Sequence, residues 1–203
     1  EPLDKAGASE VSRMTPLLFD VRGIVPIGYA FFAFVLGVAV GMLVRRALVA
    51  MAVTVVVFTA LQIAVPLLVR PYLLPPTTAT VEITRDNLGG LMAEGPNSPL
   101  QVEVKSPDPG AWILTNETLD KSGNIVRNIA INAHQGACAP DPAAPGPAET
   151  CFEAIRQLGY EQRIVYHAAD RFWPLQWIET GLYLLLGFGL AGFCFYRIRR
   201  NLT

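Results

Sequence analysis

Three long apolar segments constrain this chain more than any other feature. Residues 24–44 carry no charge, and residues 47–69 contain only two threonines and one glutamine as polar side chains. Residues 172–196 form the third segment, which includes the acidic Glu179. A helix of about 20 apolar residues crosses the roughly 30 Å hydrocarbon core of a membrane. With 52% hydrophobic and only 16% charged residues, we predict three transmembrane helices rather than a soluble core.

The arginines predict how these segments are oriented. Arg45 and Arg46 lie between the first two segments, and Arg197, Arg199 and Arg200 follow the third. The opposite ends carry single arginines: Arg22, Arg70 and Arg171. Clustered basic residues stay on the cytoplasmic side of a membrane. The short turn and the C-terminus should therefore be cytoplasmic, and the region between the second and third segments should be extracytoplasmic.

This orientation bears on what precedes Glu1. Three spans with a cytoplasmic C-terminus place residues 1–22 outside, and this polar stretch has no signal peptide. We therefore expect an odd number of spans before Glu1, so that the chain is the C-terminal half of a larger membrane protein. The expected parts are an interfacial segment, two membrane helices, an extracytoplasmic domain, a third helix and a cytoplasmic tail: residues 1–22, 23–45, 46–71, 72–170, 171–197 and 198–203.

Residues 72–170 are too many for an unstructured loop and predict a small α+β domain. Runs rich in β-branched residues predict strands at 78–84, 100–105, 111–116, 124–132 and 162–167. The intervening NLGG, with Gly89–Gly90, and three similar stretches predict turns. Apolar spacing over 148–160 predicts a short amphipathic helix. The predicted fold is therefore an all-α membrane bundle with an α+β domain inserted between its last two helices.

Cys138 and Cys151 flank the Pro/Ala-rich stretch APDPAAPGPAET. An extracytoplasmic location permits oxidation, and a disulfide would restrict this loop in the unfolded chain. We expect the two cysteines to be bonded; two free thiols are the alternative.

The sequence offers little chemistry. The only histidines are His134 and His167, and there is no CxxC, HExxH, GxSxG or phosphate-binding glycine loop. A metal or thiol site at His134 and Cys138 is less favoured than a disulfide and a solvated histidine. Net charge is −1, so no basic field recruits nucleic acid. We predict no catalytic, metal or cofactor residue in this chain.

The apolar segments contain features of packed helices. Gly37 and Gly41 have the GxxxG spacing that allows close helix approach, although small residues are frequent throughout the chain. Pro66 should kink or end the second helix. Trp173 and Trp177 lie on one helix face, where they mark the outer headgroup level.

Two blocks make the chain similar to a known family. They are LFDVRGIVPIGYAFFAFVLGVAVGMLVRRALVAMAVTVVVF (18–58) and YHAADRFWPLQWIETGLYLLLGFGLAGFCFYRIRR (166–200), with FDVRGIVPIGYA and FWPLQWIETG as the specific parts. These blocks resemble the C-terminal half of permease subunits of bacterial ATP-binding-cassette (ABC) exporters of the type-2 architecture, which export drugs and polysaccharides. The resemblance covers roughly half of the chain.

The resemblance implies six membrane helices per permease in the bacterial plasma membrane, with the three helices here as the fourth to sixth. It implies a second permease half or copy and a separate nucleotide-binding subunit that carries ATP and Mg²⁺. The permease itself would not be an enzyme and would form the substrate path and extracytoplasmic gate. A membrane-anchored extracytoplasmic sensor is the alternative, and a membrane hydrolase is disfavoured by the missing catalytic residues.

Three charged residues are candidates for a role at the outer interface. Glu179 should be shallow, in the first turn of its helix near the N-terminus, and hydrogen-bonded toward the bundle. We expect residues 15–23 to lie along the outer surface, with Asp20 and Arg22 paired to each other or to the last helix. Interfacial anchoring is the alternative for these two charges.

Overall fold

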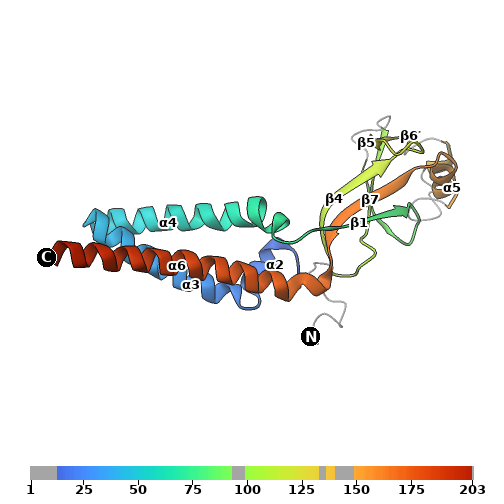
Figure 1. Cartoon of the computed structure of the whole chain (residues 1–203). Helices are drawn as coiled ribbons and strands as arrows, with labels where there is room; N and C mark the ends of the chain where they lie inside the picture. Colours follow the sequence, from blue (N-terminus) through green and yellow to red (C-terminus); the bar gives the residue numbers. More distant parts are fainter. Residues whose placement is uncertain (1–12, 93–98, 133–135, 140–148, 203) are drawn as a thin grey trace. The chain divides into compact units, whose positions relative to one another are not determined.

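The structure, a computed structural model, describes residues 13–92, 99–132, 136–139 and 149–202. The chain forms two compact units (Figure 1). The helical unit comprises Glu1–Pro75 and Asp170–Thr203, and the sheet unit comprises Pro76–Ala169. The sheet unit is thus an insertion between two helices of the helical unit.

The helical unit contains the three predicted long helices. They are α3 (Val25–Val44), α4 (Ala47–Ala64) and α6 (Phe172–Leu202), and a short helix, α2 (Pro16–Val21), precedes them. Spans that include these three helices are long and apolar enough to cross a membrane. The prediction of three membrane helices with an inserted α+β domain is confirmed, and a total of six helices stays a prediction.

Helices α3 and α6 pack along an aromatic seam. The ring of Tyr183 lies 4.6 Å from that of Tyr29 and 5.6 Å from that of Phe32. A Cβ atom added at Gly28 would lie 3.4 Å from backbone atoms of Thr180, so glycine permits this close approach. Gly187 is similarly covered, since an added Cβ would lie 2.5 Å from the ring of Phe31.

The predicted GxxxG pair contributes less than this seam. An added Cβ at Gly37 would lie 3.8 Å from Cγ2 of Thr54 on α4, whereas one at Gly41 would meet nothing within 4 Å. Gly41 instead accepts a hydrogen bond through its carbonyl from the N–H of Arg45, which has a left-handed φ of 53°. Gly41 therefore lies at the turn into α4 and not at a close helix contact.

Helix α4 changes its winding at Pro66. A π-helical turn, η1 (Val65–Val69), follows Ala64, and a 3₁₀ turn, η2 (Arg70–Tyr72), follows η1. Proline lacks the N–H that an α-helix would use at this position, and the N–H of Arg70 bonds to the carbonyl of Val65. The predicted disruption at Pro66 is present, and the wider turn shifts every following side chain around the helix axis.

Among its described residues, the sheet unit contains two antiparallel sheets and one α-helix, α5 (Glu149–Gln157). The first sheet has the order β1-β7-β4-β5 and the second has the order β2-β3-β6. The strands are β1 (Thr77–Glu82), β2 (Leu88–Met92), β3 (Pro99–Val104), β4 (Trp112–Leu119), β5 (Ile125–Val126), β6 (Ile129–Asn132) and β7 (Glu161–His167).

Two predictions for this unit were wrong in detail. Gly89 and Gly90 lie in strand β2 and not in a turn, and a Cβ added at Gly89 would lie 3.2 Å from the Glu103 carbonyl oxygen of β3. Glycine is used there because the neighbouring backbone is close. The run 124–132 is not one strand, because β5 pairs with β4 while β6 pairs with β3.

A buried glutamine joins the two sheets. Gln162 of β7 accepts a hydrogen bond from Thr118 Oγ1 (2.9 Å) and donates to Asn116 Oδ1 (2.6 Å) and to the Val102 carbonyl (3.2 Å). The amide of Asn116 in turn donates to the Val104 carbonyl. Buried polar groups need such partners, so this network fixes the first sheet against β3 around an apolar core that includes Ile129, Ile155 and Ile164.

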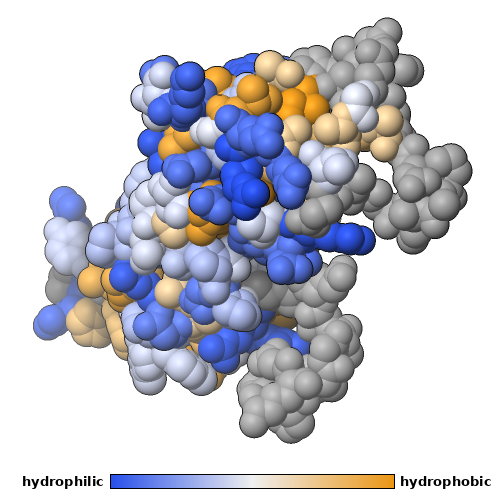
Figure 2. Space-filling view, turned by 90° about the vertical axis from the view of Figure 1, so that its right-hand side faces the viewer, coloured by the Kyte–Doolittle hydropathy of each residue, from blue (hydrophilic) through white to orange (hydrophobic). Residues whose placement is uncertain are grey.

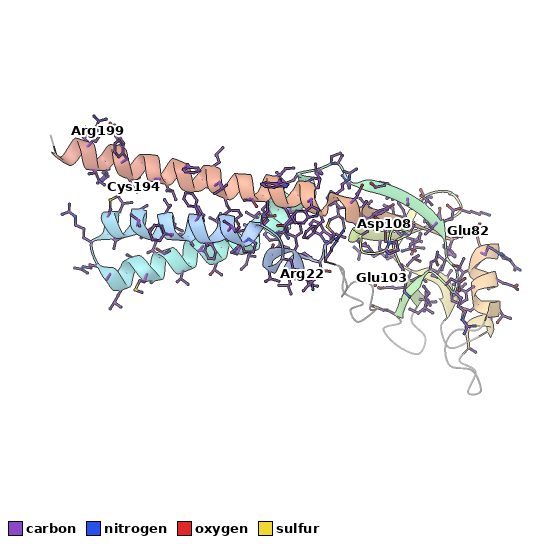
Figure 3. The ribbon with its side chains drawn as sticks, turned by 90° about the horizontal axis from the view of Figure 1, so that it is seen from below. Arg22, Glu82, Glu103, Asp108, Cys194 and Arg199 are labelled. Carbon is purple, nitrogen blue, oxygen red and sulfur yellow. A yellow bond between two sulfur atoms is a disulfide. The ribbon has the colours of Figure 1, made fainter. Side chains whose placement is uncertain are left out.

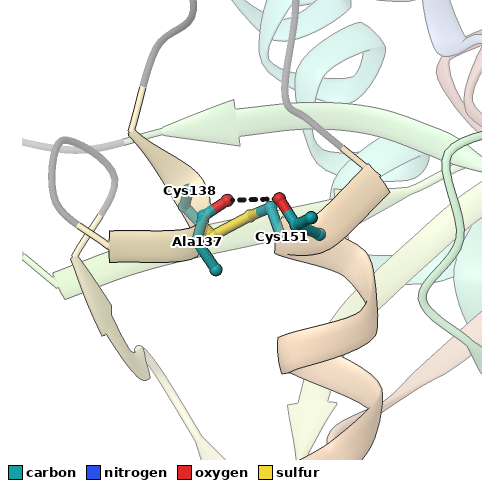
Figure 4. Close-up of a disulfide and its surroundings, with 4 residues drawn as sticks. Ala137, Cys138 and Cys151 are labelled. Carbon is teal, nitrogen blue, oxygen red and sulfur yellow. Dashed lines mark hydrogen bonds between the residues drawn. A yellow bond between two sulfur atoms is a disulfide. The ribbon is translucent and has the colours of Figure 1, made fainter.

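The cysteines of the sheet unit are joined. A disulfide links Cys138 to Cys151 at the start of α5, and Thr150 donates its hydroxyl to the Ala137 carbonyl at 3.0 Å (Figure 4). Cys138 therefore offers no free thiol, and His134 lies outside the described residues. The bond connects α5 to the 3₁₀ turn η3 (Gly136–Cys138).

The two units differ in their surfaces. Among the described residues, the exposed large hydrophobic side chains of the sheet unit are Met92, Ile125 and Leu158, whereas the helical unit exposes many along all three long helices. Figure 2 shows hydrophilic residues interspersed with small hydrophobic patches on the face in view. The surface of the sheet unit is suited to water, and that of the helical unit is suited to lipid or to further helices.

Candidate functional site

The charged residue within the third apolar segment lies in a buried ion pair. Glu179 of α6 accepts hydrogen bonds from Arg70 through both carboxylate oxygens, at 2.8 Å from Nε and 2.9 Å from Nη2. Tyr29 Oη of α3 donates to the same carboxylate at 2.6 Å. The side chains of Arg70 and Glu179 are both 0% exposed. Glu179 thus faces the bundle with its charge matched by a two-pronged guanidinium contact.

A second carboxylate shares the same arginine. Asp20 of α2 pairs with Nη2 of Arg70 and lies 3.1 Å from Tyr29 Oη. Its side chain is 23% exposed, and burial raises the pKa of this carboxyl while Arg70 acts in the opposite direction. Asp20, Tyr29, Arg70 and Glu179 are called the Arg70 cluster below. They connect α2, α3, the end of α4 and α6.

Aromatic packing completes the surroundings of the arginine. The guanidinium of Arg70 lies over the ring of Phe19, 4.2 Å from its centroid, which is a cation–π geometry. Nη1 of Arg70 is buried without a hydrogen-bond partner among the described residues. The contacts of the guanidinium with carboxylates therefore use Nε and Nη2. The π-helical turn at Pro66 precedes Arg70 and sets the direction in which this side chain leaves the helix.

Beside the cluster, the amide of Gln176 holds the corner between α2 and α3. Its Oε1 accepts from the N–H groups of Ile24 and Val25, each at 3.0 Å. Its Nε2 donates to the carbonyls of Phe19 (3.0 Å) and Arg22 (2.9 Å). One side chain of α6 thus satisfies two N–H groups at the start of α3 and two carbonyls at the end of α2, groups that helix ends leave without partners.

Gly23 makes this arrangement possible. Its φ is +82°, a left-handed conformation that favours glycine. A Cβ atom at this position would lie 2.5 Å from Oε1 of Gln176. The two specific sequence blocks, FDVRGIVPIGYA and FWPLQWIETG, therefore meet here, with Gly23 and Gln176 in direct apposition.

The structure places the other interface candidates as follows. Trp173 and Trp177 are 52% and 66% exposed on α6, and their place at the outer headgroup level stays a prediction. Arg22 lies beside α2 (Figure 3) and contributes its carbonyl to Gln176. The ion-pair partner of Asp20 is Arg70, which was not among the predicted partners.

The predicted position of Glu179 in the first turn of its helix was wrong. Helix α6 begins at Phe172, and no acidic residue lies in its first turn. Glu179 lies two turns into the helix, about 10 Å along its axis, where the helix dipole contributes little. The ion pair with Arg70 replaces the helix terminus as the source of its stabilisation.

Four residues of the site were not predicted from the sequence: Arg70, Tyr29, Gln176 and Gly23. A signal for Arg70 was present, because a buried acid near the outer end of one segment calls for a base at the same depth. Arg70 is the charged residue that follows the neighbouring apolar segment. The roles of Tyr29 and Gln176 depend on how three helices rotate about their axes, which sequence spacing does not give.

A second candidate lies at the other end of α6. Phe193, Tyr196, Arg197 and Arg200 border a hollow of about 200 Å³. All four belong to one helix, so the hollow is a surface feature of α6 and not a passage between helices. Within the described residues, no group of three or more His, Cys, Asp or Glu side chains could hold a metal ion. The Arg70 cluster is the stronger candidate.

Comparison with known proteins agrees with a membrane role. The three helices and the family match define a membrane protein. Residues 1–70, about a third of the chain, match the family described as ABC-2 membrane transporter related. This segment includes Asp20, Tyr29 and Arg70, and it relates the chain to the permease-type membrane component of such transporters. A search of curated proteins and a search of solved structures each find no match.

Proposed function

We propose that this chain forms part of the permease of an ATP-driven ABC exporter in a bacterial plasma membrane, and that the Arg70 cluster latches the extracytoplasmic ends of its helices. The observation that carries the proposal is the buried Arg70–Glu179 pair between two apolar helices. Ionisable groups in membrane helices are costly and typically mark pathways or moving parts. The ABC-2 match of residues 1–70 supplies the class of transporter.

The side of the membrane follows from charge. Arg45 and Arg46 lie at the turn between α3 and α4, and the C-terminus of α6 lies at the same end of the helices (Figure 1), where Arg199 is found (Figure 3). Under the positive-inside rule, this end is cytoplasmic. The Arg70 cluster lies near the opposite ends of the helices and is therefore assigned to the extracytoplasmic side, as is the sheet unit.

The contacts support a latch that can open. The guanidinium of Arg70 joins the end of α4 to α6 through Glu179 and to α2 through Asp20. A separation of α4 from α6 would break a small number of strong directional contacts, which favours a switch between a closed and an open arrangement over a gradual deformation. In the proposed cycle, ATP and Mg²⁺ act on a partner nucleotide-binding subunit. A second permease half completes the substrate path. The contacts of the Arg70 cluster then open, and substrate leaves toward the extracytoplasmic side.

The proposal is tested by what the full-length protein assembles with. We expect it to copurify with an ATPase subunit when the two are coexpressed, and the complex to hydrolyse ATP faster when a transported compound is added. If no ATPase subunit associates and no ATP hydrolysis responds to candidate compounds, the exporter assignment fails. The alternative of an extracytoplasmic sensor predicts that result, together with ligand binding by the sheet unit in the full chain.

A further inference from the structure

The hydroxyl of Tyr29 lies between two carboxylates and has one hydrogen to give. It is 2.6 Å from Glu179 Oε1 and 3.1 Å from Asp20 Oδ1. A phenol donates a single hydrogen bond and accepts through its lone pairs. The shorter contact identifies Glu179 as the acceptor of that hydrogen. The contact with Asp20 then places two oxygen lone pairs together, unless Asp20 itself carries a proton.

The charges of the cluster lead to the same point. One guanidinium faces two carboxylates, and its bidentate contact, through Nε and Nη2, is made with Glu179. Two carboxylates that share one site do not both ionise easily, and one of them retains a proton. A protonated carboxyl can donate to Tyr29 Oη and still accept from Nη2 of Arg70. This arrangement gives every contact in the cluster a donor and an acceptor.

Exposure identifies the carboxylate that exchanges the proton. Glu179 and Arg70 are 0% exposed, whereas the Asp20 side chain is 23% exposed. The charged and titratable groups that face Asp20 come from every element of the site: Tyr29 of α3, Arg70 of η2 and Glu179 of α6. Tyr183 of α6 lies next to Tyr29, and Arg22 follows Asp20 by two positions. Because Asp20 is partly exposed whereas Arg70 and Glu179 are fully buried, water reaches the cluster through Asp20.

We infer that Asp20 is a proton-binding site within the Arg70 cluster, and that release of this proton loosens α2 from the long helices. Burial is the largest influence on the pKa of Asp20 and raises it, the charge of Glu179 raises it further, and the opposing effect of Arg70 does not cancel the increase. When the pKa of a carboxyl is raised in the folded state, its bound proton stabilises the folded protein at low pH. This contribution to the free energy of unfolding is lost as pH rises through the raised pKa. The effect of this proton on transport rests on the proposed function, whereas its presence in the cluster does not.

Infrared spectroscopy of the full-length protein in lipid nanodiscs tests the proton directly. An ordinary aspartate has a pKa of about 3.9 and is ionised at pH values roughly two units higher. At such a pH we expect the C=O stretch of a protonated carboxylic acid, with an isotope shift in D₂O. The band should disappear on titration to higher pH and in Asp20→Asn. It should persist in Glu153→Gln, a control at an exposed position on α5.

A second measurement keeps the test decisive if a variant folds poorly. The thermal stability of the wild-type protein should fall across the pH range in which the band is lost, and that of Asp20→Asn should not follow this range. The inference is overturned if the wild-type protein lacks the band, if the band survives Asp20→Asn, or if wild-type stability does not change as the band titrates. None of these readouts involves transport, so a failure here is distinguishable from a failure of the exporter assignment.

Discussion

Arg70 has two carboxylate partners and Glu179 has one guanidinium partner, and this asymmetry predicts unequal effects of mutation. Arg70→Leu leaves Glu179 without its counter-ion, removes the partner that Asp20 has in the guanidinium, and also removes the contact with Phe19. Glu179→Leu leaves Arg70 with Asp20 still beside it. Breaking a buried ion pair by removing one partner costs about 3–5 kcal/mol. Arg70→Leu should lie near the upper end of this range and Glu179→Leu near the lower end.

The double variant Arg70→Leu/Glu179→Leu should cost less than the two single changes added together, because no uncompensated charge of the pair remains. Residues in direct contact show coupling of about 0.5–3 kcal/mol. The assay is reversible denaturation of the full-length protein in mixed micelles, with helical circular dichroism as the readout of the unfolding free energy.

The chain supplies a matched control for these variants. Arg163 and Glu117 of the sheet unit form an ion pair of 2.6 Å whose side chains are 34% and 33% exposed. A partly exposed pair contributes at most about 1 kcal/mol, so Arg163→Leu should have a much smaller effect. The reasoning is refuted if Arg70→Leu costs no more than Glu179→Leu, or no more than Arg163→Leu.

Three further predictions concern the neighbouring structure. Gln176→Leu removes four hydrogen bonds to backbone groups and should lower the unfolding free energy by at least about 2 kcal/mol; Gln176→Glu should recover only part of this loss, since a carboxylate accepts but does not donate. Gly23→Ala should shift the midpoint of thermal unfolding downward, whereas Gly181→Ala, where an added Cβ meets nothing within 4 Å, should not, and equal shifts would contradict the role given to Gly23. Reduction of the Cys138–Cys151 bond, which closes a loop with a sequence separation of 13, should destabilise the sheet unit by about 3 kcal/mol, measured as increased protease sensitivity of the intact chain; unchanged sensitivity would contradict this.

The long helices could be predicted from sequence because length and apolarity alone decide them. The run before Arg45 and the run after Arg46 have no other way to satisfy their backbone in a membrane. Strand positions in the sheet unit were also largely predictable from β-branched runs. Their pairing was not, because β5 and β6 are close in sequence but join different sheets, and partner choice depends on the packing of the whole unit.

The candidate site was predictable only in part, for a physical reason. The depth of Glu179 along its helix and its need for a partner follow from sequence. The identity of that partner depends on the π-helical turn at Pro66, which changes the direction of Arg70 by less than one helical turn. The capping role of Gln176 likewise depends on the bend at Gly23. Such local departures from regular helices are not visible in hydrophobic periodicity.

The most direct test of the account is substrate export by the assembled transporter that carries Glu179→Ala, compared with Glu153→Ala on the exposed face of α5. Both changes remove one glutamate, but only the first removes a contact of the latch. The account predicts that Glu179→Ala impairs export or assembly with the ATPase subunit, and that Glu153→Ala retains both at the wild-type level. Equal and negligible effects of the two substitutions would contradict it.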